Sequence, residues 1–564
     1  MILNSFSGNE TFERLAAIGL IANFMVFLLN VFHMDQVMAV NVLSIWWGVS
    51  NFSPLIGAFI SDAYLGRFKT IAYATFVSFA GMLTMTLIAW IPRLHPPPCD
   101  QVQAHQCIGP NKTQFGVLAM ALAFLSIGTG GIRPCSLPFG VDQFDSSTQE
   151  GRRDINSFFN CYYTSFTVVL IVALTLVVYI QDNVSWVWGF GIPTTLMLCS
   201  IVLFFLGMRL YVYVKPEGSC FTGIVQVIVA SYKKRNVELP VDGGENVGGA
   251  YYDPPLTKGT IVKKLSLTSQ FRFFNKAALI MEGEILTDGS TSNPWRLCSI
   301  QHVEETKCLY RVIPIWASGI ICFTAMAQQG TFTVSQASKM DRHLGPNFQI
   351  PPGSLSVISM ITVGIWLPFY DRIFVPYLRK ATRIEGGITQ LQRMGIGMVF
   401  SIMSMIVAGL VERVRRASAT LHAGPDGIAP ITVLWLAPQL MLMGFAESFN
   451  IIGQIEFYNK EFPENMSSLA NSLFSCTMAG SSYLSAFLVN VVHKTTGGHG
   501  HPDWLTKDIN KGRVENLYFL IAGLGVLNLG YFMWVARRYR YKSKFRIDNR
   551  DFSLDDDIEL SARS

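Results

Sequence analysis

The sequence predicts an all-α membrane protein with twelve transmembrane helices in two six-helix bundles. Half of the 564 residues are apolar and only 15% are charged, and the mean hydropathy is +0.34. The apolar residues gather in runs of about 20, the length that crosses ~30 Å of hydrocarbon. This composition excludes an ordinary soluble domain. The net charge of +6 arises from 44 basic and 38 acidic residues. Because the surplus lies in loops and at the C-terminus, it does not indicate nucleic-acid binding.

The apolar runs separate into two sets of six. A polar segment rich in Lys, Asp and Gly, residues 214–307, divides them and predicts a cytoplasmic linker with an amphipathic helix near 270–280. We therefore expect an N-terminal bundle in 1–213, a C-terminal bundle in 308–540 and a disordered acidic tail in 541–564. The predicted spans are 10–33, 38–61, 71–92, 114–138, 157–180, 187–213, 309–333, 354–376, 390–414, 431–457, 468–493 and 515–537.

The distribution of Lys and Arg predicts the orientation. Basic residues follow the second, fourth, eighth and twelfth spans, which places both termini in the cytoplasm. We expect the plasma membrane as the location. The segment VERVRRAS after the ninth span breaks this pattern. The loop after the third span suits an extracellular face, because it holds Cys99, Cys107 and the sequon that begins at Asn111. A disulfide between the two cysteines and a glycan on Asn111 are therefore candidates. The other cysteines show no metal-ligand spacing.

Five ionisable residues lie inside predicted spans. Glu10, Glu13 and Arg14 share one face of the first helix, Arg133 lies in the fourth span and Glu447 in the middle of the tenth. Charges that persist in a bilayer face the bundle interior or an aqueous cavity. Two cations and three acids neutralise each other only if one acid binds a proton, which predicts proton coupling. The alternatives are helix capping by the two N-terminal acids, a structural role for Glu447, and an Arg133 that reaches the membrane surface.

Several sequence motifs resemble those of a known family. The Glu10-x-x-Glu13-Arg14 cluster resembles the ExxER motif of the proton-dependent oligopeptide transporter family within the major facilitator superfamily, and GAFISDAYLGRFKTIAYAT resembles the signature that joins that family's second and third helices. The segments QFRFFNKAA, VEETKCLYRVIPIW, YDR, LQRMGIG and FPENM narrow the resemblance to the plant nitrate/peptide transporter family. GTGGIRPCS, GTFTVSQASKMDR and YVYVKPEGS are most similar to the subgroup with low-affinity nitrate transporters of the phloem and glucosinolate transporters.

The resemblance implies the major facilitator superfamily fold, with two bundles that rock around a central cavity. It assigns Glu10, Glu13 and Arg14 to proton coupling. Arg133 stands where many relatives have a lysine, and Glu447 matches the acid that pairs with that cation. Because a guanidinium does not deprotonate at accessible pH, the proton is expected on a glutamate. Thr70, in Arg67-x-x-Thr70, matches a kinase-type site of the best known nitrate member, and the alternative is an ordinary loop without modification.

The substrate is less well defined by the resemblance. Met326 stands where the best known nitrate relative has a histidine, and Gly330 where it has a threonine, so nitrate would need other donors such as Arg14 or Arg133. The aromatic pair that follows ExxER in peptide transporters is replaced by LAAIG, which disfavours peptides. The remaining candidates for the cavity are polar and could equally join helices to each other. They are Gln328, Gln329, Asn450 and Gln454.

The sequence therefore favours proton-coupled import of nitrate with low affinity. The first alternative is symport of a larger organic solute, such as a glucosinolate, gibberellin or abscisic acid, in a roomier pocket. The second is a nitrate sensor that signals through Thr70 with little flux. The expected partners are a small anion, protons, membrane lipid and a kinase, without nucleic acid or cofactor. An enzyme is excluded, because no nucleophile with a base, no phosphate-binding loop and no metal cluster is present.

Overall fold

The structure is a computed structural model whose described residues form two compact units. Unit 1 comprises Met1–Gly218, Gly319–Ile451 and Phe474–Asn528, and unit 2 comprises Ser219–Ser318, Ile452–Leu473 and Leu529–Ser564. The residues that the structure describes are 11, 14–20, 23–98, 108–144, 168–209, 211–213, 220–239, 250–254, 265–287, 289–345, 348–382, 387–422, 427–463, 466–497, 503–506 and 508–539.

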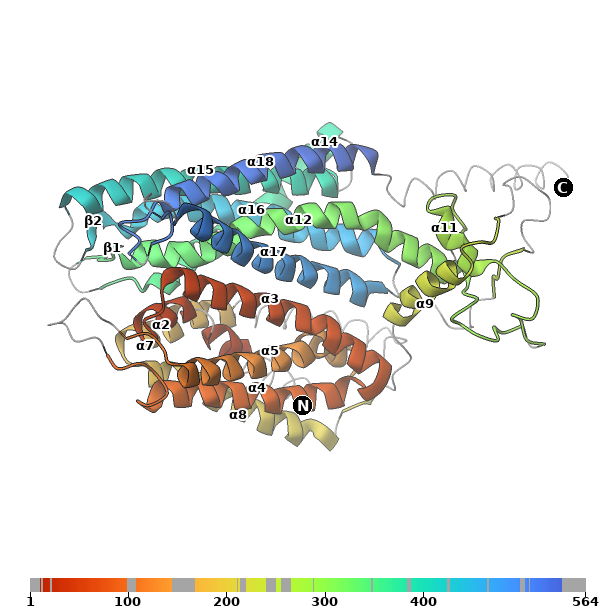
Figure 1. Cartoon of the computed structure of the whole chain (residues 1–564), viewed down its shortest axis with the longest axis horizontal. Coiled ribbons are helices and arrows are strands. Elements are labelled where there is room, and N and C mark those ends of the chain that lie inside the picture. Colours follow the sequence, from red (N-terminus) through yellow and green to blue (C-terminus); the bar gives the residue numbers. More distant parts are fainter. Residues whose placement is uncertain are drawn as a thin grey trace. The chain divides into compact units, whose positions relative to one another are not determined.

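The described part of the chain is built almost entirely of helices (Figure 1). Those of the first half are α2 (Phe24–Asn30), α3 (Gln36–Ile60), α4 (Arg67–Trp90), α5 (Lys112–Val141), α7 (Val178–Asn183) and α8 (Trp186–Leu206). Those of the second half are α12 (Ile300–Ser338), α13 (Ser356–Phe369), α14 (Val375–Thr382), α15 (Gln390–His422), α16 (Ala437–Glu461), α17 (Ser467–Thr496) and α18 (Val514–Arg538). Two short strands, β1 (Met340–Asp341) and β2 (Ala429–Thr432), pair in parallel.

Within the described residues, nine helices are long and apolar enough to cross a membrane. They coincide with nine of the predicted spans. The first and fifth predicted spans lie partly outside the described residues, and their described parts are helical. The tenth is α16, a helix of 25 residues that carries Glu447, Asn450 and Gln454. These polar side chains explain why an apolar-run criterion separates α16 from the other nine.

Two boundaries differ from the sequence-based expectation. Helix α12 begins at Ile300 rather than near 309, because its charged first turns pack against the preceding segment: Glu304 accepts hydrogen bonds from the Thr268 amide and from the Lys307 ammonium. The amphipathic helix expected near 270–280 is shorter than that range. Only α11 (Arg272–Asn275) and a single 3-10 turn form there, since Phe271 adopts a left-handed conformation with φ 50°. The longer helix of this region is α9 (Cys220–Lys233).

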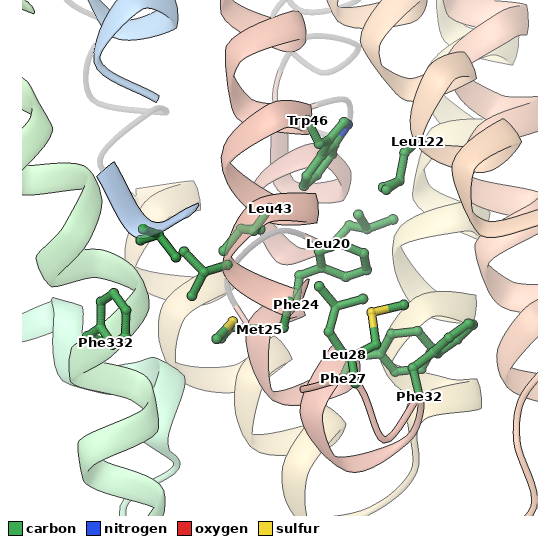
Figure 2. Close-up of a cluster of buried hydrophobic side chains, with 14 of the residues drawn as sticks. Leu20, Phe24, Met25, Phe27, Leu28, Phe32, Leu43, Trp46, Leu122 and Phe332 are labelled. Carbon is green, nitrogen blue, oxygen red and sulfur yellow. The ribbon is translucent and has the colours of Figure 1, made fainter. Parts of the chain in front are cut away.

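Buried hydrophobic side chains, many of them aromatic, form a cluster in unit 1, which we call the aromatic cluster (Figure 2). The rings of Phe24 and Trp46 have centroids 5.3 Å apart, and those of Phe27 and Phe190 are 5.0 Å apart in an edge-to-face arrangement. Phe332 of α12 joins the same cluster. Since lipid tails are as apolar as these side chains, close packing rather than exclusion of water holds the helices together.

Glycines bring the backbones of α3, α4 and α5 close to each other. A Cβ at Gly57 of α3 would lie 1.9 Å from the carbonyl oxygen of Gly130 in α5, and a Cβ at Gly131 would lie 2.4 Å from the Ala74 Cβ of α4. No side chain fits at these positions without moving a helix. Small residues at such crossings are the usual means of tight packing between membrane helices.

The two halves of the chain meet within unit 1 near the first turns of α3. The amides of Asn41 and Asn490 form two reciprocal hydrogen bonds, of 2.9 and 3.0 Å, which link α3 to α17. Arg342 pairs with Asp182 at 3.3 Å, between the segment after α12 and α7. We call the end of unit 1 that holds these contacts the α3 N-terminal end.

A fully buried ion pair lies inside α15. The Arg415 guanidinium binds both carboxylate oxygens of Glu412 at 2.7 Å, and Gln336 of α12 donates to the same carboxylate at 2.7 Å. Arg415 also donates to the Asn510 side chain at 2.6 Å. The network thus ties α12, α15 and the segment before α18 together with every charge compensated.

This network explains the exception to the charge pattern. The basic segment VERVRRAS belongs to α15, which continues to His422, rather than to a loop after the ninth span. Arg415 is neutralised by Glu412, and Arg416 pairs with Glu515 at 2.5 Å. Arg413 is exposed, so the segment carries much less uncompensated positive charge than its sequence suggests.

Replacing Glu412 by Gln is expected to destabilise the protein strongly. The substitution leaves the buried Arg415 cation without its counter-charge, and breaking a buried pair in this way costs about 3–5 kcal/mol. The measurement is the thermal unfolding midpoint of the purified protein in detergent. Arg413→Gln, on the exposed side of the same helix, is the matched control and should leave the midpoint unchanged. Equal midpoints for the two variants would contradict the assignment.

Candidate functional site

The ExxER cluster is described only in part. Arg14 lies in the helical residues 14–20 and is half-buried. Glu10 and Glu13 lie outside the described residues, so the expected contact between these acids and Arg14 stays a prediction. The next described helix is α2, whose buried side chains belong to the aromatic cluster of unit 1.

Arg133 presents an accessible side chain in the C-terminal third of an apolar helix. It lies in α5 between the closely packed Gly131 and Pro134, and its side chain is exposed. Its Nη1 lies 3.5 Å from the Asn51 side-chain oxygen of α3. The Asn51 amide is itself oriented by a 2.9 Å bond to the Trp47 carbonyl. A cation held on a rigid helix in this way can attract an anion or a carboxylate.

Glu447 lies in the middle of α16 and is half-buried. Among the ion pairs between described residues, none joins Glu447 to Arg133. Asn450 and Gln454 follow at i+3 and i+7, so the three side chains share one face of the helix. Asn450 donates to the Ala446 carbonyl at 3.2 Å, whereas Gln454 is fully buried and neither atom of its amide has a partner within the described residues.

The four candidate residues of α12 divide into two pairs. Gln328 is buried and donates to the Ser485 carbonyl of α17 at 3.0 Å, and Gln329 accepts from the Ser404 hydroxyl of α15 at 3.0 Å. Met326 is half-buried and Gly330 is exposed, with no atom within 4 Å of an added Cβ. The two glutamines therefore join α12 to neighbouring helices. Met326 and Gly330, which are spaced i, i+4, lie on the more exposed side of α12.

The modification candidates are also placed by the structure. Thr70 is buried, and its hydroxyl donates to the Gly66 carbonyl at 2.9 Å, so a kinase reaches it only if this turn opens. Asn111 caps α5, with its side chain accepting from the Gln114 amide at 2.8 Å. Cys99 and Cys107 lie outside the described residues. Within them, no group of His, Cys, Asp or Glu side chains is suited to a metal ion.

Two sets of polar residues were not anticipated from the sequence. One is the Glu412 and Arg415 network, for which the i, i+3 spacing of opposite charges was the available signal. The other is the amide pair of Asn41 and Asn490, which are 449 residues apart in the chain. No local pattern predicts such a contact.

Comparison with known sequences identifies the family to which this chain belongs. The sequence matches the PTR2 profile, described as the POT family, over residues 68–505. It is 58% identical to Protein NRT1/ PTR FAMILY 2.13 of Arabidopsis thaliana over 559 residues, which cover 99% of this chain and 89% of that protein. It is 55% identical to Protein NRT1/ PTR FAMILY 2.12 of the same plant over 560 residues, with 99% and 95% covered.

Solved structures agree in fold at low sequence identity. The crystal structure of an auto-inhibited POT family peptide transporter matches with a TM-score of 0.69 at 20% identity, covering 96% of this chain and 97% of that chain. A POT family transporter in complex with 5-aminolevulinic acid matches with a TM-score of 0.58 at 13% identity, with 95% and 96% covered. The predicted class of an all-α membrane protein with the fold of these transporters is therefore confirmed, and the described helices are consistent with the predicted total of twelve.

The two pairs on α12 should differ in stability when substituted. Gln328→Ala removes a buried bond between helices, worth about 0.6 kcal/mol on average in a membrane protein, and should lower the thermal midpoint. Gly330→Ala adds a methyl group to open space and removes a helix-destabilising glycine, so it should keep or raise the midpoint. Thermal unfolding of both variants measures this. A lower midpoint for Gly330→Ala than for Gln328→Ala would contradict the placement.

Proposed function

Because the chain belongs to the POT family of membrane transporters and is no enzyme, we propose that it imports nitrate together with protons by alternating access. The observation that supports this most directly is the exposed side chain of Arg133 inside the apolar helix α5, with its Nη1 3.5 Å from the Asn51 side-chain oxygen. A cation that is accessible within a membrane-spanning helix can bind an anion. In the proposed cycle, the pairing of Arg133 with Glu447 differs between the outward-open and the inward-open states.

The proposed cycle begins with the cavity open to the acidic outside. A glutamate of the Glu10 and Glu13 pair takes up a proton, which releases Arg14 or Arg133 to bind the anion. Neutralisation of the cavity allows the halves to close. Loss of the proton on the inside restores the attraction between Arg133 and Glu447, and the anion leaves.

The charge balance sets the stoichiometry. One elementary charge moved through 100 mV is worth ~2.3 kcal/mol. A single proton carried with one nitrate moves no net charge, so more than one proton per nitrate is needed if the membrane potential is to contribute. We also propose that both termini are cytoplasmic, on the basis of the loop charges described above, and that the protein resides in the plasma membrane.

A larger organic solute is a second candidate, favoured by the open side of α12. Met326 offers no charged donor, and Gly330 leaves free space where a threonine would add a hydroxyl group. Competition between nitrate and a panel of glycosides and acidic hormones, measured as uptake and current in oocytes at two pH values, discriminates between the two. A sensor with little flux would instead bind nitrate without current. Thr70 is buried, so a kinase does not reach its hydroxyl in this conformation. This burial disfavours signalling through phosphorylation of Thr70.

The coupling assignment predicts a specific loss in Glu10→Gln. The variant should lose accumulation of substrate against a gradient, and the dependence of uptake on external acidity should disappear with it, because the proton-binding carboxylate is gone. Exchange of labelled for unlabelled substrate, which needs no net proton movement, should persist. Glu282→Gln, at an exposed position outside the bundles, is the control and should accumulate normally. Intact uphill uptake by Glu10→Gln would refute the assignment.

Arg133 predicts a separable defect. Arg133→Ala should raise the substrate concentration needed for half-maximal uptake, because the anion loses its accessible cation. Arg133→Lys keeps the charge and should recover most of the affinity. Initial uptake rates over a range of substrate concentrations measure both effects. If Arg133→Ala and Arg133→Lys behave alike, the charge at this position does not bind the substrate.

A further inference from the structure

A groove separate from the transport residues lies at the α3 N-terminal end. Its volume is about 720 Å³, within the range of small-molecule binding sites. It is lined by the first turns of α3, by Phe115 of α5, and by residues from the end of α17 and the segment that follows. Neither Arg133 nor Glu447 contributes to it.

The mouth of the groove is acidic. Asp35 directly precedes α3, Asp503 follows α17, and both line the groove. His493 is hydrogen-bonded to Asp503 at 2.5 Å, and Asp503 also accepts from the Thr496 hydroxyl and the Leu505 amide, each at 2.9 Å. The lining holds no Lys or Arg. Two carboxylates against one imidazole favour a cationic group and disfavour an anion such as nitrate.

The wall below the mouth is apolar and continues along the membrane-spanning helices. Ile45 of the groove is 51% exposed, and Val49 and Phe52 extend the same exposed stripe of α3 at helical spacing. On α17, Phe487 and Val491 are exposed as well. An exposed apolar stripe on a membrane-spanning helix is the surface that contacts acyl chains. The groove is therefore open to lipid along its length.

We propose that this groove binds a phospholipid with a choline headgroup from the surrounding leaflet. The candidate span of α3 starts at Gln36 and that of α17 ends at Thr496, so Asp35 and Asp503 lie where the apolar spans give way to the headgroup region. The quaternary ammonium lies between the two carboxylates and near the Phe115 ring, a combination that suits such cations. One acyl chain follows Ile45 along α3.

Lipid in this groove contacts both halves of the chain. Asp35 and Ile45 come from α3, whereas His493 and Asp503 come from α17 and the segment that follows. The amide bonds between Asn41 and Asn490 hold α3 and α17 together beside the groove. A ligand that binds one conformation better than another shifts the population toward it, so the choline lipid stabilises the conformation in which this end is closed.

The test uses the full-length protein in nanodiscs of phosphatidylglycerol with a trace of phosphatidylcholine that carries a photoactivatable group next to the glycerol ester of one acyl chain, close to the headgroup. Cross-links mapped by mass spectrometry should concentrate on residues 36–45 and 503–506. Ile45→Trp fills the groove and should reduce this labelling roughly tenfold, or ~1.4 kcal/mol in relative affinity. Val49→Trp, on the same stripe but outside the groove, should not reduce it. Labelling that is spread along the stripe and equal in both variants would overturn the proposal.

The headgroup is tested separately by competition. Unlabelled phosphatidylcholine should displace the probe more effectively than phosphatidylethanolamine or added phosphatidylglycerol. Asp35→Asn should remove this preference while retaining an N-cap residue suited to α3, and the thermal midpoint of the variant checks that it is folded. Equal displacement by all three lipids, or an unchanged preference in Asp35→Asn, would rule out recognition of the choline group.

Discussion

The absence of water from the hydrocarbon layer is the constraint on which this structure depends. A polar side chain inside such a layer either finds a partner in the protein or faces a space that water can enter. Glu412 and Arg415 represent the first solution, since both are fully buried and bonded to each other and to neighbouring amides. Arg133 is exposed and Glu447 is half-buried, as the second solution requires. The same residue types thus differ in burial and in bonding from one place in the chain to another.

The contacts within each half of the chain differ in kind from the contacts between the halves. Within the first half, α3, α4 and α5 approach so closely at glycines that no methyl group fits between them. Within the second half, the buried network joins α12 to α15. Between the halves, the described polar contacts are a few neutral hydrogen bonds and the partly exposed pair of Arg342 and Asp182, and buried apolar side chains such as Phe332 pack beside them. Movement between two states requires that such contacts break while each bundle stays rigid.

Much of this architecture could be predicted from the sequence because apolar runs of the required length are a strong signal. The signal fails where a helix leaves the hydrocarbon. Glu304 and Lys307 place the start of α12 in a polar segment, yet the helix persists because these charges bind each other and the Thr268 backbone. The signal is weaker for the tenth span, since the polar face of α16 lowers its hydropathy, yet the predicted span 431–457 coincides with α16.

The sequence indicated which residue types form the candidate site, but not the direction in which each side chain points. Gln328 and Gly330 are two residues apart, and at about 100° per residue they point to nearly opposite sides of α12. Sequence alone does not say which side faces a neighbouring helix, and only the bond from Gln328 to Ser485 decides it. Met326 and Gly330 were singled out through the family resemblance rather than through any pattern of their own.

The reciprocal amide pair at Asn41 and Asn490 has an electrical consequence. Each side chain is a neutral dipole, and the two bonds are broken and formed without displacing an elementary charge through the membrane field. Breaking this amide pair therefore requires no work against the field, whereas separating Arg342 from Asp182 at the same end moves charge. The steepness of the current with voltage would thus report on the ions carried and on charged groups, and not on the amide pair.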